Sequence, residues 1–173
     1  MSARILLPVR PYIFRYLTIQ YGKELCLSDR GMVSFLLFNM LEKHKKQDPS
    51  TVRPNQKMID GIKYVGYAIF VGDIYEAARG LYISPKKIKL FNESVDDMIR
   101  EEMYRWCVHP GLKDGATDAI VDFNISRFRD FYGITEDELP FDNLKRWFYR
   151  NRERLDQRGR VEKRFEPQLI LSL

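Results

Sequence analysis

The stretch GITEDELPFDNLKRWFYRNRER, residues 133–154, combines a glycine, a helix-capping pattern, a proline and a segment rich in arginine and aromatic residues. Thr135 and Glu138 form a T-x-x-E capping box, which predicts a short helix over 136–139. Pro140 disfavours a helical backbone in the residue before it and fits the first turn of a new helix. The chain is therefore expected to turn at the glycine, form one short helix and restart at the proline.

The segments around this stretch complete the layout of a helix-turn-helix unit. The preceding segment, 117–133, can begin with Thr117 as its helix cap and stop at Gly133. After the short helix, a long helix is expected over 141–155. Three helices in this order, joined by turns, match a trihelical helix-turn-helix.

The long helix is expected to have an apolar side and a basic side. With about 100° between successive residues, Leu144, Phe148 and Leu155 fall on one stripe, and Trp147 lies beside it. Leu144, Phe148 and Trp147, with Phe131 from the preceding helix, are predicted to serve in packing. The broad remaining face favours contacts with DNA phosphates and bases. The predicted phosphate contacts are Lys145, Arg146, Arg150, Arg152 and Arg154, and the predicted sequence readers are Asn143, Tyr149 and Asn151.

Positive charge is concentrated at this end of the chain. The net charge is +5, and residues 143–164 hold nine lysine or arginine residues against three acidic ones. That segment therefore carries +6, and the rest of the chain carries −1. Within it, the RGR sequence at Arg158 and Arg160 resembles the core of an arm that enters the DNA minor groove. A basic patch confined to one end is typical of a protein that binds a polyanion, and a solvated cationic helix is the alternative.

The rest of the sequence predicts an α+β fold with a mixed N-terminal body over 1–112. Two units follow one another in the same order, each with a strand, a helix, a second short strand and a second helix. Segments 25–28 and 81–84 match, since each is apolar and ends in a serine that can cap the next helix. A β-α-β-α pseudo-repeat implies that short strands from both units share one small sheet, and a chance match is the alternative.

Two loops are expected to divide the chain. Segment 45–61 is polar and contains prolines, which predicts an exposed loop between the two units. Segment 109–117 contains a proline and two glycines and separates the body from a C-terminal helical unit over 113–173. The apolar tail, 169–173, is expected to dock on the body or to join subunits into a homo-oligomer.

No residue pattern in the chain predicts catalysis, a metal site or a cofactor. His44 and His109 lack a second ligand at metal spacing, and the common nucleotide-binding and nucleophile motifs do not occur. Cys26 and Cys107 lie far apart, so no disulfide framework is indicated and a reducing, cytoplasmic setting is expected. Cys26 lies in an apolar, strand-like stretch and Cys107 lies beside Trp106, which predicts two buried thiols. Asp97 and Glu101, one turn apart on a helix, are expected to form a solvated face that pairs with Arg100 and Arg105.

The apolar segments do not predict a membrane partner. The longest runs, FLLF at 35–38 and LILSL at 169–173, are far too short to span a bilayer. The N-terminal sequence is interrupted by Pro8 and Arg10 and lacks the continuous apolar stretch of a signal peptide. Contact with a membrane is therefore not expected.

Three stretches carry a resemblance to known proteins: LPVRPYIFRYLTIQYG (7–22), LYISPKKIKLFNESVDDMIREEM (81–103) and ISRFRDFYGITEDELPFDNLKRWFYRNRER (125–154). Together they resemble small uncharacterised proteins of bacterial phages and conjugative elements. The resemblance implies a nucleoprotein role in replication, transcription control or packaging, with no catalytic residues to carry over. The last stretch also resembles helix-turn-helix units in general.

These observations predict a cytoplasmic, non-catalytic protein that binds double-stranded DNA as a regulator or accessory factor of a phage or mobile element. The alternative is a protein-interaction or assembly module of a mobile element, in which the body and the apolar tail form an oligomer and the basic helix is only solvated. RNA is a third partner, favoured if exposed aromatics such as Tyr149 form a stacking platform.

Overall fold

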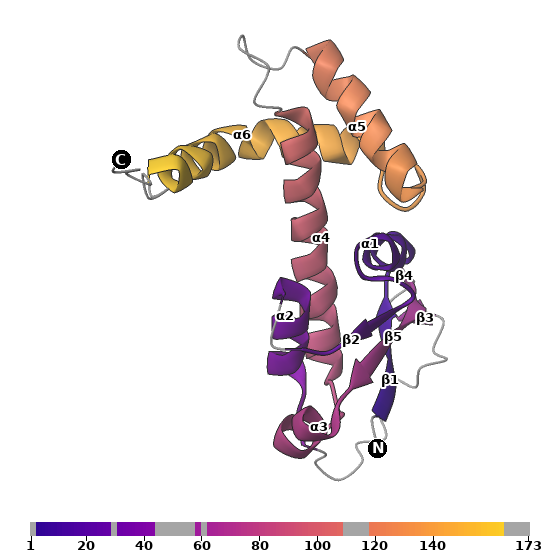
Figure 1. Ribbon diagram of the computed structural model, residues 1–173. Coiled ribbons are helices and arrows are strands. Elements are labelled where there is room, and N and C mark those ends of the chain that lie inside the picture. Colours follow the sequence, from indigo (N-terminus) through magenta and orange to yellow (C-terminus); the bar gives the residue numbers. More distant parts are fainter. Residues whose placement is uncertain (1–2, 29–30, 44–57, 60–61, 109–117, 165–173) are drawn as a thin grey trace.

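The computed structural model describes residues 3–28, 31–43, 58–59, 62–108 and 118–164 (Figure 1). The described residues form six helices and five strands, which confirms the predicted α+β class. The strands are β1 (Ala3–Val9), β2 (Glu24–Cys26), β3 (Met58–Ile59), β4 (Ile62–Lys63) and β5 (Val65–Val71). The helices are α1 (Pro11–Tyr21), α2 (Met32–Met40), α3 (Asp73–Arg79), α4 (Pro85–Cys107), α5 (Asp118–Tyr132) and α6 (Phe141–Arg164).

β5 is the central strand of a three-stranded sheet. It runs antiparallel to β1, with Ile5 opposite Ile69, and parallel to β2. Tyr67, Ile69 and Val71 are buried at alternate positions of β5, so one face of the strand lies on the core. β1 and β2 come from the first predicted unit and β5 from the second, so the predicted sharing of one sheet is confirmed.

The second unit departs from the predicted repeat in two places. Segment 81–84, predicted as a strand, forms only an isolated bridge between Tyr82 and Glu42, because it is short and connects α3 directly to α4. The predicted strand over 62–71 is interrupted at Tyr64, so β4 pairs with β3 while β5 enters the main sheet. β3 lies within the predicted loop 45–61, most of which is outside the described residues.

Glycine and proline set the helix boundaries. α1 and α3 end at Gly22 and Gly80, as predicted, with φ angles of 88° and 84°. This left-handed backbone conformation is readily adopted by glycine and is common just after a helix. Pro85 occupies the first turn of α4, and Ser84 stands at the predicted N-cap position, although its side chain makes no capping hydrogen bond.

α4 is the long helix that connects the two ends of the fold (Figure 1). The sheet and α2 pack against its first half, and α5 and α6 pack against its second half. Phe91, Val95, Ile99 and Met103 are buried at the four-residue spacing of one helix face. One cluster of buried side chains therefore extends from the sheet to α5 and α6. The division of the chain into units 1–112 and 113–173 stays a prediction.

Polar side chains of α4 hold the neighbouring elements. The buried Asn92 accepts the backbone N–H of Arg10 (2.9 Å) and donates to a carbonyl of β1 (3.0 Å). The Glu102 carboxylate accepts hydrogen bonds from Tyr16 (2.8 Å) and Tyr132, so α1, α4 and α5 meet at one group. Burial and this carboxylate raise the pKa of both phenols. Glu102 therefore joins three helices through its side chain.

The predicted short helix over 136–139 is a single hydrogen-bonded turn. The N–H groups of Glu138 and Leu139 both donate to the Thr135 carbonyl, at 3.2 and 3.1 Å. The Thr135 N–H donates to the Glu138 carboxylate at 3.1 Å, as the capping box predicts. The turn cannot grow into a helix because Pro140 has no N–H to donate and disfavours a helical residue before it. The described part of the C-terminal unit thus holds two helices and a turn, and a trihelical helix-turn-helix is not confirmed.

The two cysteines lie in different environments. Cys107 is buried in α4, and burial raises the pKa of its thiol to about 12, so it is unreactive at neutral pH. Cys26 is exposed on β2, and the prediction of a buried thiol there is wrong. Side chains alternate across a strand, and Leu25 takes the buried position beside it.

Candidate nucleic-acid interface

α6 packs against the body by its predicted apolar stripe. Leu144, Phe148 and Leu155 are buried, and Trp147 is partly buried against the same core. The Phe148 ring lies 5.4 Å from the ring of Tyr104 on α4. These contacts confirm the predicted inward side and fix which residues of α6 face outward.

Two acids of α5 occupy part of the predicted basic face. The Lys145 ammonium lies 2.8 Å from the Asp122 carboxylate, which raises the pKa of the lysine. One turn later, the Tyr149 hydroxyl donates a hydrogen bond to Asp118, which raises the pKa of the phenol to about 12. Both side chains therefore have partners on α5.

Two more of the predicted contacts are engaged within α6 itself. Arg152 forms an ion pair with Asp156 at 3.9 Å. The Asn151 side-chain amide donates to the Trp147 carbonyl at 2.9 Å, so one of its donors is already used. With the two side chains held by α5, four of the predicted DNA contacts have partners in the protein.

The other described contacts form one exposed row along α6, which we call the open row. It consists of Asn143, Arg146, Arg150 and Arg154, at three- and four-residue spacing. Within the described residues, Arg146 and Arg150 have neither a hydrogen bond nor an ion pair. Arg154 lies close enough to Asp97 of α4 to oppose the rise that burial causes in the pKa of that carboxyl. The open row is the part of the predicted face that a ligand can reach.

The surroundings of the open row include acids and a stretch without described side chains. Asp142 and Glu153 are exposed beside the row and reduce its net charge. Arg158 and Arg160 lie outside the residues whose side chains the structure describes, so their minor-groove contacts stay predictions.

The sequence contains a signal for the acidic neighbours that the helix-turn-helix prediction did not use. Asp118 and Asp122 are one turn apart, as are Lys145 and Tyr149. The later acid pairs with the earlier residue of α6, and the earlier acid with the later residue. The two helices therefore run in opposite directions where they meet, and an antiparallel hairpin would have predicted both pairs.

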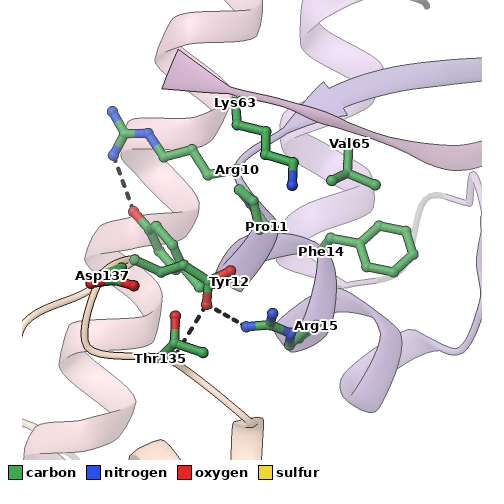
Figure 2. Close-up of a pocket in the computed structure, with 10 residues that line it drawn as sticks. Arg10, Pro11, Tyr12, Phe14, Arg15, Lys63, Val65, Thr135 and Asp137 are labelled. Atoms are coloured by element: carbon green, nitrogen blue, oxygen red, sulfur yellow. Dashed lines mark hydrogen bonds and ion pairs between the residues drawn. The ribbon is translucent and has the colours of Figure 1, made fainter. Parts of the chain in front are cut away.

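A cavity of about 730 Å³ lies where the connection between α5 and α6 meets the first turn of α1 (Figure 2). Its charged lining consists of Arg10, Arg15, Lys63, Asp137 and Glu138. Apolar surface comes from the first turn of α1 and from β5. Because cations and acids lie side by side, the cavity lacks the single-sign lining that a polyanion site requires.

Arg15 links α1 to the connection that precedes α6. Its guanidinium donates to the Gly133 carbonyl (2.7 Å) and to the Glu138 carboxylate, which also accepts the Thr135 N–H (3.1 Å). Partial burial alone would raise the pKa of Glu138, but the hydrogen bonds from Arg15 and Thr135 lower it below its usual value. This pair holds the segment from which α6 begins and so orients the open row.

Arg10 begins a second network at the same cavity, in which Figure 2 shows its bond to Tyr12. Arg10 donates to the Tyr12 hydroxyl (3.0 Å), Tyr12 donates to Asp96 (2.9 Å), and Arg100 donates to the same carboxylate (2.8 Å). Burial and Asp96 raise the pKa of Tyr12 to about 12. In the described part of the molecule, the Arg10 Nε is buried without a hydrogen-bond partner. The network attaches the first turn of α1 to α4.

Replacing Arg15 by methionine is expected to lower the free energy of unfolding by about 1–2 kcal/mol at neutral pH, because a partly buried, charge-assisted hydrogen bond is lost. The pKa of Glu138 is lower in the folded state than in the unfolded state. The stability from this pair is therefore present above the unfolded-state pKa and is lost as the pH falls through the folded-state pKa. Urea titrations of both proteins at neutral and acidic pH measure the difference.

The matched control is Arg4→Met, because Arg4 pairs with Glu24 at 3.4 Å with both side chains largely exposed. This substitution should lower the free energy of unfolding by less than about 0.5 kcal/mol. Equal losses for the two variants at neutral pH, or an Arg15→Met loss that does not shrink in acid, would contradict the positioning role of Arg15.

In the described part of the chain, no three side chains of His, Cys, Asp or Glu gather closely enough to hold a metal ion. None of the helices in the described ranges is long and apolar enough to cross a bilayer. No family model, no curated protein and no solved structure matches this chain.

Proposed function

We propose that the protein binds double-stranded DNA without catalysis, through the open row of α6. The observation that carries this proposal is the pair Arg146 and Arg150, which are exposed, adjacent on one helix face and without a partner among the described residues. A guanidinium presents a planar fork of donors that fits phosphate oxygens and the major-groove edge of guanine. Asn143, at the start of the row, adds an amide that can read adenine.

The position of α6 supports access to a groove. Figure 1 shows α6 crossing α4 and continuing beyond it, away from the sheet. A helix about 10–12 Å in diameter fits the major groove, which is about 12 Å wide. The nine residues from Arg146 to Arg154 extend over about 12 Å of helix axis, enough for the arginines to reach successive backbone positions.

The proposed contact set is narrower than the sequence predicts. Lys145, Tyr149, Asn151 and Arg152 have partners within the protein and contribute less to DNA binding than the open row. A role as regulator or accessory factor of a phage or mobile element is proposed on the resemblance of the chain to such proteins. That role requires binding alone and no catalytic group.

The double substitution Arg146→Ala/Arg150→Ala is expected to weaken duplex binding and its dependence on salt. Each phosphate contact contributes about 0.9 to the slope of log K against log salt, so losing two should reduce the slope by about 1.8. Fluorescence anisotropy with a labelled duplex at several salt concentrations measures both quantities.

The control for this experiment is Lys145→Ala/Arg152→Ala, which removes the same charge from two side chains that already pair with acids. It should change the salt slope by less than about half as much as the first variant. Unchanged duplex binding by the Arg146→Ala/Arg150→Ala protein would end the proposal, as would the absence of any duplex binding at low salt.

An assembly module is the second candidate, and exposed apolar side chains favour it. Met32 and Phe35 are exposed about one turn apart on α2, and Ile74 is exposed on α3. The tail at 169–173, which is predicted to dock on the body or to join subunits, lies outside the described residues. The candidates differ in salt dependence, since phosphate contacts weaken steeply with salt and apolar contacts between copies do not.

A further inference from the structure

A second cavity, of about 420 Å³, lies between the end of α4 and the middle of α5. It is lined by Arg105, Trp106, Asn124 and Arg127. Both charged residues are cations, and no acidic side chain belongs to the lining. Within the described ranges, neither arginine forms an ion pair or a hydrogen bond. The cavity is therefore a site of single-sign charge, unlike the cavity beside α1.

Aromatic rings surround these arginines. Trp106 packs edge-on against the buried Phe128, with 5.5 Å between the rings, and lies tilted against Phe131 at 5.4 Å. Phe131 is 56 % exposed and Phe123 is 61 % exposed, and the Arg127 guanidinium lies 5.7 Å from the centre of the Phe123 ring. Phe131, which is predicted to pack, contacts Trp106 and Tyr132, but much of its ring is exposed on the outward side of α5.

This aromatic and arginine surface is separate from the open row. At about 100° per residue, Phe123, Arg127 and Phe131 form one ridge of α5, whereas Asp122, which binds α6, points to roughly the opposite side. Asp130 is exposed on α5 but does not line the cavity. A ligand on the ridge would not need to touch α6.

The chemistry of the surface selects for a ligand that is both flat and anionic. Water solvates exposed aromatic rings poorly. A patch of exposed apolar surface on a folded protein commonly marks a binding site. Arginines without partners favour a phosphate group, and rings beside them favour a stacked base. A nucleotide offers both groups. In a duplex both faces of each base are stacked, so the base must be unpaired.

We propose that the α4–α5 cavity binds unpaired nucleotides of a single-stranded nucleic acid, with a base on the aromatic surface and its phosphate on Arg105 and Arg127. DNA and RNA strands both offer bases for stacking and phosphates for ion pairs, so the same contacts can form with either strand. This binding uses none of the open row and is independent of the proposed duplex contact. The two surfaces together suit a junction between a duplex and a single strand.

Tryptophan fluorescence tests the proposal at the cavity itself. The chain contains two tryptophans, and Trp147→Phe leaves Trp106 as the single reporter. Titration with short oligothymidylate and oligouridylate strands at low salt is expected to quench the Trp106 emission, because a stacked base contacts the indole. Quenching in either titration supports the proposal, and the stronger one identifies the preferred strand.

The decisive variant is Arg105→Ala/Arg127→Ala in the same single-tryptophan protein. It should weaken strand binding by about 10- to 100-fold. Its melting temperature should be unchanged, because both side chains are exposed. The control, Arg146→Ala/Arg150→Ala, should change strand affinity by less than about threefold while it weakens duplex binding.

Three outcomes would overturn the proposal: no quenching at low salt, equal strand affinity with and without the two cavity arginines, or equal competition by inorganic phosphate and by thymidine monophosphate. The last outcome would show that the base takes no part. Loss of duplex binding with strand binding intact would reject the α6 contact alone, so the two proposals fail separately.

Discussion

Replacing Phe148 by alanine is expected to lower the free energy of unfolding by about 3–5 kcal/mol. Its side chain is 0 % exposed and packs against Tyr104 of α4, with 5.4 Å between the rings. Alanine would leave a cavity where α6 crosses α4, and closely packed helices can only partly close such a cavity. The loss is a large share of the roughly 5–15 kcal/mol that stabilises a typical domain. Urea unfolding followed by circular dichroism measures it.

Phe131→Ala is the control, because it removes the same side chain from a position that is 56 % exposed. It should cost less than about 1 kcal/mol. Equal losses for the two variants would mean that the contact between Phe148 and α4 does not hold α6 in place. Duplex binding by the Phe148→Ala protein is expected to fall with its folded fraction, since the open row depends on that placement.

Gly80→Ala is expected to lower the free energy of unfolding by about 2–5 kcal/mol, because it adds both backbone strain and a steric clash. Gly80 has a φ angle of 84°, and an added Cβ would lie 2.5 Å from the Glu42 carbonyl oxygen and 2.8 Å from the Lys43 Cα. Both neighbours are backbone atoms, so no side chain can move aside. The bridge in which Tyr82 and Glu42 exchange hydrogen bonds of 3.2 and 2.8 Å should open. Amide hydrogen exchange at these two residues measures the opening.

Gly22→Ala isolates the steric part of this effect. Gly22 has a φ angle of 88°, close to that of Gly80, but an added Cβ would meet nothing within 4 Å. The cost should therefore be backbone strain alone, about 1–2 kcal/mol, with no change in exchange at the bridge. If urea unfolding shows that Gly80→Ala lowers the free energy of unfolding no more than Gly22→Ala does, the close approach of the Glu42 backbone causes no additional destabilisation.

Features that depend on a few neighbouring residues could be predicted from the sequence. Gly22 and Gly80 end their helices because glycine adopts a left-handed backbone without a clash between Cβ and the chain. Leu144 and Phe148 are buried because the spacing of apolar residues defines one side of a helix. The capping contact between Thr135 and Glu138 forms because it spans only one turn.

Features that join distant segments could not be predicted in the same way. β5 lies between β1 and β2, and no local pattern shows which strands will be neighbours. One local prediction was also wrong: the helix expected over 136–139 stops after one turn, because a capping box can start a helix but cannot continue it into Pro140. The aromatic ridge of α5 was also missed, since spacing alone does not show that Phe131 faces outward.

By itself, the sequence determined the positions of the main helices, the inward stripe of α6 and the concentration of positive charge near the C-terminal end of the chain. Only the tertiary structure decided which of those charged side chains are exposed without a partner in the described part of the protein. Asp122 holds Lys145, while Arg146, the next residue, lies about 100° further around α6 and has no partner in the described part of the chain. The direction of a side chain around a helix follows from local spacing. An ion pair between helices requires both to lie within a few ångströms, and the packing of the whole core sets that distance.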